Sequence, residues 1–184
     1  MPAMGEVPQI NPLAIATYAT NPLIGADCAS RQAVAQLIHT YSYAWDSRDA
    51  HATASLFTED AELAFFVNGT KQPTQKTVGR ESILEGMSAR STMLKRWQIE
   101  TRHLMLNTVF GPIENDAIQA MTTAVIYWQQ LPTHPQPIAV QTGYYKSWCV
   151  ETSDGWLFQR RATFLSGIFH PRELYDKPAM EEPT

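Results

Sequence analysis

The sequence predicts a single α+β domain, in which N-terminal helices pack against a curved antiparallel sheet. Three observations carry this prediction. Amphipathic helical patterns occupy the first half of the chain, long β-rich segments occupy the second half, and short turn-forming stretches separate those segments. Helices followed by consecutive strands are typical of the α+β class. The length of 184 residues suits one domain with a core of its own.

The folded body is expected to span residues 27–168. Residues 1–26 carry Pro8, Pro12 and Pro22 and show no periodicity, so we expect an irregular N-terminal arm there. Residues 169–184 are expected to form a C-terminal tail for the same reasons.

Three helices are predicted in the first half of the chain. The first begins at Asp27 or Ser30, which are both good N-cap residues, and ends near Asp46. Its apolar residues repeat at the spacing of one helical face, and they are Val34, Leu37, Ile38, Tyr41 and Trp45. A short second helix is expected at about 49–57, and a third from Gly79 to about Lys95.

The strands are predicted mainly in the second half. Residues 61–67 are expected to form a first strand, and residues 68–78 a turn-rich loop. Longer segments rich in β-branched and aromatic residues follow at 97–110, 117–131, 138–151 and 156–166. Because Gly, Pro, Asn and Asp separate these segments, they predict an antiparallel meander.

The predicted strand 117–131 is apolar on both faces. Ile126 and Trp128 lie on one face, and Val125 and Tyr127 lie on the other. One face can pack on the helices, and the other needs cover. We therefore expect a homodimer formed through the sheet.

Composition excludes several classes of function. The net charge of −4 and the lack of a basic stripe argue against nucleic-acid binding. The N-terminus lacks the pattern of a secretory signal, and no apolar run reaches the ~18 residues that span a bilayer. Cys28 and Cys149 are too few for a disulfide framework, so we expect a reducing, cytoplasmic location and no membrane contact.

The motifs of the commonest cofactor and metal enzymes are also missing from the sequence. It has no Gly-rich phosphate loop, no nucleophile elbow and no His pair at zinc-binding spacing. We expect no metal and no organic cofactor. What remains is a set of single polar residues placed among apolar ones.

His103 is the first of these residues. Strand alternation groups it with Ile99, Thr101, Met105, Asn107 and Val109 on the more apolar face of its strand. An imidazole in that position is either a core histidine with a satisfied hydrogen bond or a base that lines a pocket. The strand pattern alone favours the core histidine.

Asp46 and Tyr41 leave similar alternatives open. Asp46 ends the first helix, where a carboxylate either faces water or turns into a cavity to orient a histidine. The helical wheel does not decide, because Asp46 lies about 100–120° from the centre of the apolar stripe. Tyr41 lies on that stripe, where a tyrosine that belongs to the core is the simpler interpretation.

Several short motifs occur in an order that resembles the SnoaL-like group of the nuclear transport factor two superfamily. They are Tyr41 followed by Asp46-Ser47-Arg48-Asp49, then Leu56-Phe57-Thr58-Glu59-Asp60-Ala61, Gly79-Arg80-Glu81-Ser82-Ile83, Arg102-His103 with Asn107, and Gly155-Trp156. The resemblance covers roughly residues 30–166. It implies a cone-shaped domain in which the N-terminal helices pack on a strongly curved, mostly antiparallel sheet.

The resemblance also implies a function. Members of this group include scytalone dehydratase, bile-acid dehydratase, a dehydrochlorinase and small polyketide or terpenoid cyclases. Several use an Asp of the first helix with a His of the following strand, positions that Asp46 and His103 match. Tyr41 matches a catalytic tyrosine of part of the group, and Arg161 an arginine that assists a leaving group. The expected activity is therefore that of a cofactor-free lyase or isomerase.

The substrate expected from this resemblance, and from the aromatic and methionine content of the sheet, is a small apolar polyketide-, terpenoid- or steroid-like molecule. The side chains expected to contact it are those of Trp45, Met105, Asn107, Tyr127 and Arg161. One departure matters, because 117–131 lacks the second carboxylate found in some dehydratases of the group. The alternative is a non-catalytic module of the same fold that binds a small ligand or assembles with a partner.

Overall fold

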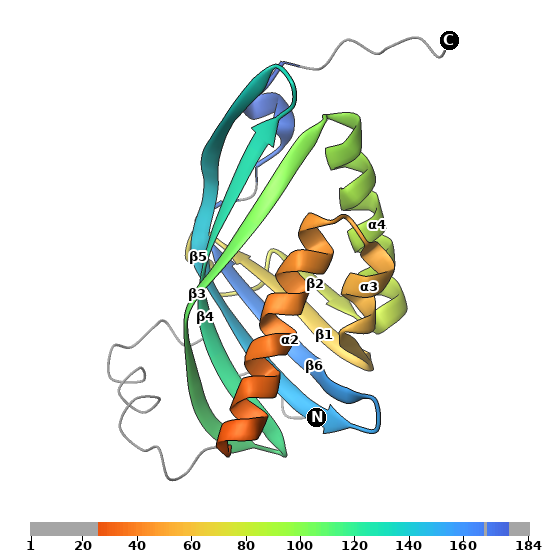
Figure 1. Cartoon of the computed structure of the whole chain (residues 1–184), viewed down its shortest axis with the longest axis vertical. Helices are drawn as coiled ribbons and strands as arrows, with labels where there is room; N and C mark the ends of the chain where they lie inside the picture. The colour runs from red at the N-terminus through yellow and green to blue at the C-terminus, as the bar shows by residue number, and fades with distance from the viewer. Residues whose placement is uncertain (1–25, 168, 177–184) are drawn as a thin grey trace.

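The computed structural model describes residues 26–167 and 169–176. Within these residues, three helices pack on one six-stranded sheet with the strand order β2-β1-β6-β5-β4-β3. Figure 1 shows the helices together on the concave side of this strongly curved, unclosed sheet. The predicted α+β class is confirmed. Of the arm expected at 1–26, residues 1–25 lie outside the described residues, as do residues 177–184 of the tail expected at 169–184.

The helices begin and end close to the predicted residues. Helix α2 spans Cys28–Asp46, and the Asp27 carboxylate caps it by accepting a hydrogen bond from the Ser30 amide at 2.9 Å. Helix α3 spans Ala50–Ser55, and α4 spans Arg80–Arg96. The predicted apolar stripe of α2 is buried from Val34 to Tyr41, so it packs on the sheet as expected.

The strands are β1 (Phe57–Val67), β2 (Gln75–Val78), β3 (Ile99–Glu114), β4 (Ala117–Gln130), β5 (His134–Thr152) and β6 (Gly155–Leu165). Strands β1, β3 and β5 are longer than predicted, and β4 and β6 lie within one residue of their predicted bounds. Strands β3 to β6 form the predicted antiparallel meander, and β1 joins it by pairing parallel to β6. Strand β2 lies inside the segment that was expected to be a loop.

Prolines did not end the strands where the sequence suggested. Strand β3 continues through Pro112 and turns only at Asn115 and Asp116, which both have positive φ. As β3 is the last strand of the sheet, a proline there removes no necessary ladder hydrogen bond. Strand β5 likewise begins at His134, in a stretch that precedes its first pairing with β6 at Gly143.

A β-bulge at Asn107 overturns part of the predicted face of β3. Asn107 has φ 50°, and the register between β3 and β4 shifts between Leu106 and Val109. Thr108, not Asn107, then meets the buried Thr122, with 3.0 Å between their hydroxyl oxygens. Side-chain alternation therefore changes by one residue at the bulge. His103 and Met105 keep the predicted face, whereas the prediction for Asn107 and Val109 is wrong.

The packed body extends beyond its predicted end at residue 168. Residues Pro171–Glu173 form a 3₁₀ helix. Tyr175 is 5% exposed and belongs to the main hydrophobic core, and Phe169 packs against that core. The Gln130 side chain donates to the Asp176 carbonyl at 3.0 Å. The segment 169–176 is therefore part of the domain and not of a tail.

Candidate active site

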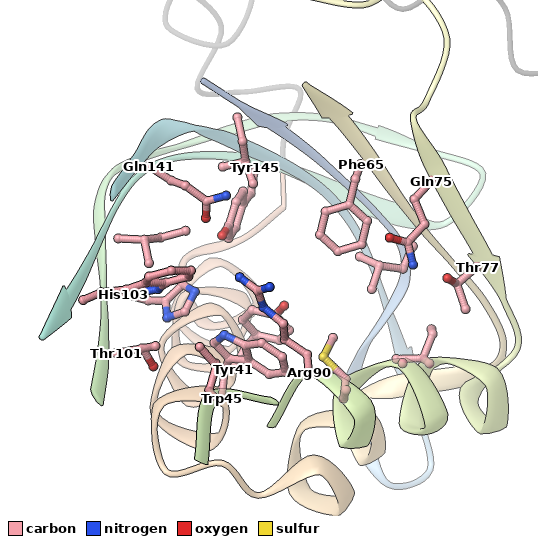
Figure 2. A pocket seen from close by; sticks show the side chains of 18 residues that line it. Tyr41, Trp45, Phe65, Gln75, Thr77, Arg90, Thr101, His103, Gln141 and Tyr145 are labelled. Carbon is pink, nitrogen blue, oxygen red and sulfur yellow. The ribbon is translucent and has the colours of Figure 1, made fainter. Parts of the chain in front are cut away.

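A cavity of about 190 Å³ lies between the inner face of the sheet and helices α2 and α4. Figure 2 shows side chains from all of these elements projecting into it. Most of its lining residues are apolar or aromatic, and the polar or titratable ones are Tyr41, Gln75, Thr77, Arg90, Thr101, His103, Gln141 and Tyr145. A concave, mostly apolar site with a few polar groups is the usual form of a small-molecule site.

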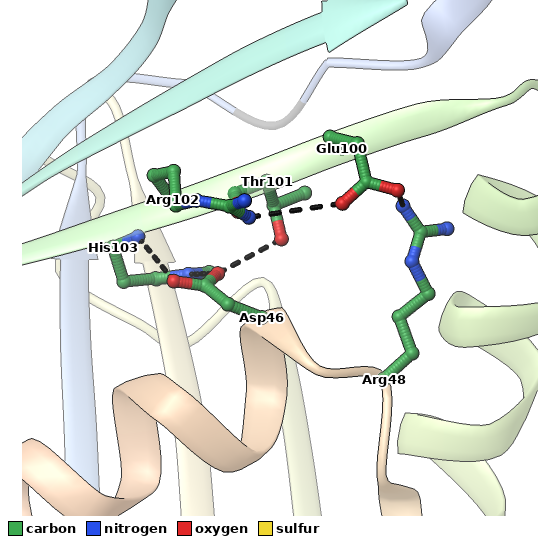
Figure 3. A network of polar contacts seen from close by, with 6 residues as sticks. All are labelled: Asp46, Arg48, Glu100, Thr101, Arg102 and His103. Carbon is green, nitrogen blue, oxygen red and sulfur yellow. Dashed lines mark hydrogen bonds and ion pairs between the residues drawn. The ribbon is translucent and has the colours of Figure 1, made fainter. Parts of the chain in front are cut away.

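Asp46 and His103 form a hydrogen-bonded pair at the wall of this cavity. The distance from His103 Nδ1 to Asp46 Oδ1 is 2.6 Å, and the two side chains are 5% and 13% exposed respectively. The sequence pattern left both residues with a simpler alternative. The structure brings the two side chains together, and the role of His103 as a base stays a prediction. Asp46 turns away from water toward β3, as Figure 3 shows, and His103 lines the cavity.

The Asp46 carboxylate is held by two further donors from β3. Thr101 Oγ1 donates to Asp46 Oδ1 at 2.8 Å, and the backbone amide of His103 donates to Oδ2 at 2.8 Å. These bonds fix the carboxylate and require no proton on it. They also assign the His103 tautomer, because a carboxylate acceptor at Nδ1 calls for a proton on that nitrogen. The Nε2 lone pair is then available to act as a base.

Local structure at the end of α2 aims Asp46 at the strand. The helix ends at Asp46, and Arg48 adopts a positive φ of 59° two residues later. Arg48 Nη2 then lies 3.3 Å from Glu100 Oε1 on β3. This ion pair joins the chain after α2 to the same strand that carries Thr101 and His103 (Figure 3). This change in chain direction after α2 turns the Asp46 side chain toward β3, which the helical wheel alone could not predict.

Trp45 and Tyr41 line the cavity as predicted. The Trp45 ring meets the His103 ring edge-on, with 6.3 Å between the ring centroids. Tyr41 is 5% exposed, and burial raises the pKa of its hydroxyl above the usual value. Its phenol therefore remains protonated at neutral pH and can donate a hydrogen bond to an oxygen atom in the cavity.

Tyr145 is a lining residue that was not among the predicted site residues. It is 4% exposed, and burial raises the pKa of its hydroxyl strongly. Like Tyr41, it offers a neutral phenol to the cavity. Strand alternation places it on the same face of β5 as Gln141, which also lines the cavity. The alternation of polar and apolar residues along β5 could have identified both Gln141 and Tyr145 as inward-facing residues.

Arg161 points inward but does not line the cavity. Its side chain is fully buried, and its guanidinium carbon lies 4.0 Å from the Tyr41 ring centroid and 4.6 Å from that of Tyr145. Nη1 donates to the Ser147 hydroxyl at 3.4 Å. The expected direct contact with substrate is therefore corrected. Arg161 lies behind the two phenol rings and can act on the cavity only through them.

Three other residues expected to contact substrate also lie outside the cavity lining. Tyr127 alternates with the lining residues Ile126 and Trp128, so it belongs to the outer face of β4. Asn107 is exposed at the bulge described above. Met105 shares the inner face with His103 but packs against the core.

No group of three or more His, Cys, Asp or Glu side chains in the described part of the chain is arranged to hold a metal ion. Within the same residues, none of the helices is long and apolar enough to cross a membrane.

The tautomer assignment makes a spectroscopic prediction. We expect the His103 Nδ1 proton to give a far-downfield NMR resonance that is protected from exchange, because its hydrogen bond to Asp46 is short and shielded. In Asp46→Asn the resonance should move upfield or disappear. Glu151→Gln, which changes an exposed carboxylate near the end of β5, should leave it in place. A wild-type spectrum without such a resonance would contradict the assigned pair.

The fold and the site can now be compared with known proteins. A search of curated protein sequences finds no significant match. ActVI-ORFA from Streptomyces coelicolor is 18% identical, with a TM-score of 0.62 over 73% of this chain and 96% of that one. A proposed scytalone dehydratase from Novosphingobium aromaticivorans is 18% identical, with a TM-score of 0.60 over 75% and 85% of the two chains.

A third solved structure, an NTF2-like protein with a cystatin-like fold from the same Novosphingobium species, is 21% identical, with a TM-score of 0.59 over 74% of this chain and 82% of that one. At these identities the likeness concerns the fold. The sequence profile of the SnoaL-like domain matches residues 26–162. This range includes the elements from α2 to β5, most of β6 and both members of the Asp46–His103 pair. The chain therefore belongs to the SnoaL-like domain family of the NTF2-like superfamily.

Proposed function

We propose that this protein is a lyase or isomerase that needs no metal or organic cofactor and uses His103 as its general base. The observation that carries the proposal is the 2.6 Å hydrogen bond between His103 and Asp46 at the wall of an apolar cavity. In the assigned tautomer His103 Nε2 carries no proton, so its lone pair can accept one from a carbon atom of the substrate. The fold relatives that are named for dehydratase chemistry support this class of reaction without fixing it.

The first step would be the removal of a proton from a carbon atom beside a carbonyl or a leaving group. The C–H bond breaks, the proton moves to His103 Nε2, and the bonding electrons move toward the adjacent carbon. Asp46 stabilises the imidazolium that forms, because its carboxylate already accepts the Nδ1 proton. Base catalysis of this kind contributes about 10²–10⁴-fold to the rate.

The same electron pair has three outcomes. In an elimination it forms a C=C bond and expels hydroxide, which takes up the proton held on His103 Nε2 and leaves as water. In an isomerisation it rests on the carbonyl oxygen as an enolate, and His103 then returns the proton to a different carbon atom. In a ring closure the enolate carbon attacks a second carbonyl carbon of the same molecule, whose C=O π bond breaks as its oxygen takes up the proton from His103. Tyr41 or Tyr145 can donate a hydrogen bond to the enolate oxygen, since both phenols are neutral and line the cavity.

The catalytic proposal is tested on a panel of cyclic ketones and β-hydroxyketones of one or two rings. Wild-type protein should exchange the acidic carbon-bound proton of at least one compound in D₂O, or convert that compound, as measured by NMR. We expect His103→Ala to lower this rate by about 10²–10⁴-fold and Asp46→Asn to lower it substantially. His39→Ala, which removes an exposed histidine of α2, is the matched control.

Unchanged rates in both active-site variants would end the catalytic proposal. Binding of the compounds without exchange or conversion in wild-type protein would favour the alternative of a non-catalytic module that binds small ligands.

We further propose that the protein is a homodimer whose copies meet through the outer face of the sheet. Leu104 and Leu106 are 44% and 43% exposed on the outer face of β3. Val125 and Tyr127 of β4 lie beside them and are half-buried. These residues form an apolar patch on two neighbouring strands. A patch of this kind can pair with its own copy about a two-fold axis.

Replacing Leu104 and Leu106 together by lysine should convert a dimer to a monomer in sedimentation velocity experiments, because four like charges would then face one another. Tyr43→Lys is the control, since Tyr43 is 75% exposed on α2, away from this patch. A wild-type protein that sediments as a monomer at all concentrations would contradict the dimer.

A further inference from the structure

Arg90 is the cation among the residues that line the cavity. It comes from α4, and Figure 2 shows its side chain reaching into the space that Tyr41 and Trp45 border. Its guanidinium carbon lies 5.2 Å from the Trp128 ring centroid, and Nη2 donates to the Phe169 carbonyl at 3.3 Å. One neutral hydrogen bond leaves most of the five guanidinium N–H donors free.

No carboxylate in the described part of the chain forms an ion pair with Arg90. Asp46, the carboxylate that pairs with the lining residue His103, already accepts hydrogen bonds from His103 and Thr101. Burial lowers the pKa of Arg90, and no neighbouring charge contributes to that shift. An arginine still remains charged at neutral pH. A partly buried charge without a partner is costly, which suggests that an anion completes this site.

A second unpaired cation lies behind the cavity. Arg161 is fully buried, and its Nε and Nη2 atoms have no hydrogen-bond partner. With the imidazole of His103 neutral, the charges in and directly around the cavity are two guanidinium groups and one carboxylate. Both guanidinium groups act through a medium of low polarity, so their field is weakly screened. The cavity is therefore biased toward a ligand with a negative charge.

We infer that Arg90 binds an acidic group of the ligand, so that the preferred substrate is a flat apolar molecule that carries a carboxylate. The guanidinium fork and a carboxylate match in geometry and can form two parallel hydrogen bonds. The acid group would anchor one end of the molecule at α4, and its apolar ring would lie against Trp128 and toward His103. This inference rests on the proposed function only in that both place the substrate in the same cavity.

The test compares two probes that differ in charge and not in shape, 2-naphthoate and 2-naphthamide. Their affinities for the full chain are measured by calorimetry at low ionic strength. Wild-type protein should bind the carboxylate about 10–100-fold more tightly than the amide, as expected for a charge-assisted pair. Arg90→Met should remove that preference and leave the affinity for the amide within about two-fold, because methionine keeps the apolar stem.

Two further variants make the result specific. Arg90→Lys keeps the charge without the fork and should retain part of the preference. Arg102→Met removes an arginine whose side chain is 61% exposed and paired with Glu100, so it should bind both probes like wild type. The comparison of 2-naphthoate with 2-naphthamide on wild-type protein tests the inference even if Arg90→Met fails to fold.

Three outcomes would overturn the inference: equal binding of both probes to wild type, equal weakening of both by Arg90→Met, or no binding of either probe. Failure of this inference can be distinguished from failure of the catalytic proposal. His103→Ala should keep the preference for 2-naphthoate even though it lowers the rate of proton exchange or turnover. A protein that prefers the carboxylate but exchanges no proton would keep this inference and lose the catalytic one.

Discussion

The Asp46 carboxylate at the end of α2 is the constraint on which the site depends. A carboxylate is unfavourable at a helix C-terminus, where the partial charge of the helix is negative. Three donors on β3 offset this cost. They are the Thr101 hydroxyl, the His103 backbone amide and His103 Nδ1. Because the same carboxylate joins a helix end to a strand and orients the imidazole, the folding of the domain and the arrangement of the site are linked. The ion pair between Arg48 and Glu100 holds the following turn to the same strand.

Much of the fold could be predicted because its signals are local. The α2 stripe and its Asp27 cap gave the helix bounds, and the runs of β-branched residues gave strands β3 to β6. The bulge at Asn107 could not be predicted, since asparagine tolerates a positive φ in many settings and alternation gives no sign of an extra residue. The strand β2 was missed because the pairing with β1 creates it, and its own residues are polar.

The site was predictable in part for the same reason. Alternation placed Thr101 and His103 on one inward face, but only the turn at Arg48 brings Asp46 to them. Arg161 was expected to contact substrate, but the sequence gives no depth within the core, and the side chain lies behind the cavity. Arg90 was missed although it continues the stripe formed by Ile83, Met87 and Leu94. A charged residue on an apolar stripe is the signal that points to such a position.

The most direct test of the account is a double-mutant cycle between Asp46 and His103, read as the free energy of unfolding. Asp46→Ala, His103→Ala and the double variant would be compared with wild type by chemical denaturation. If the two side chains act as one buried hydrogen-bonded unit, either change alone already breaks the pair. The sum of the losses in the two single variants should then exceed the loss in the double variant by about 0.5–3 kcal/mol. Losses that add within error would show that the pair does not exist in solution, and the proposed base would then have no support.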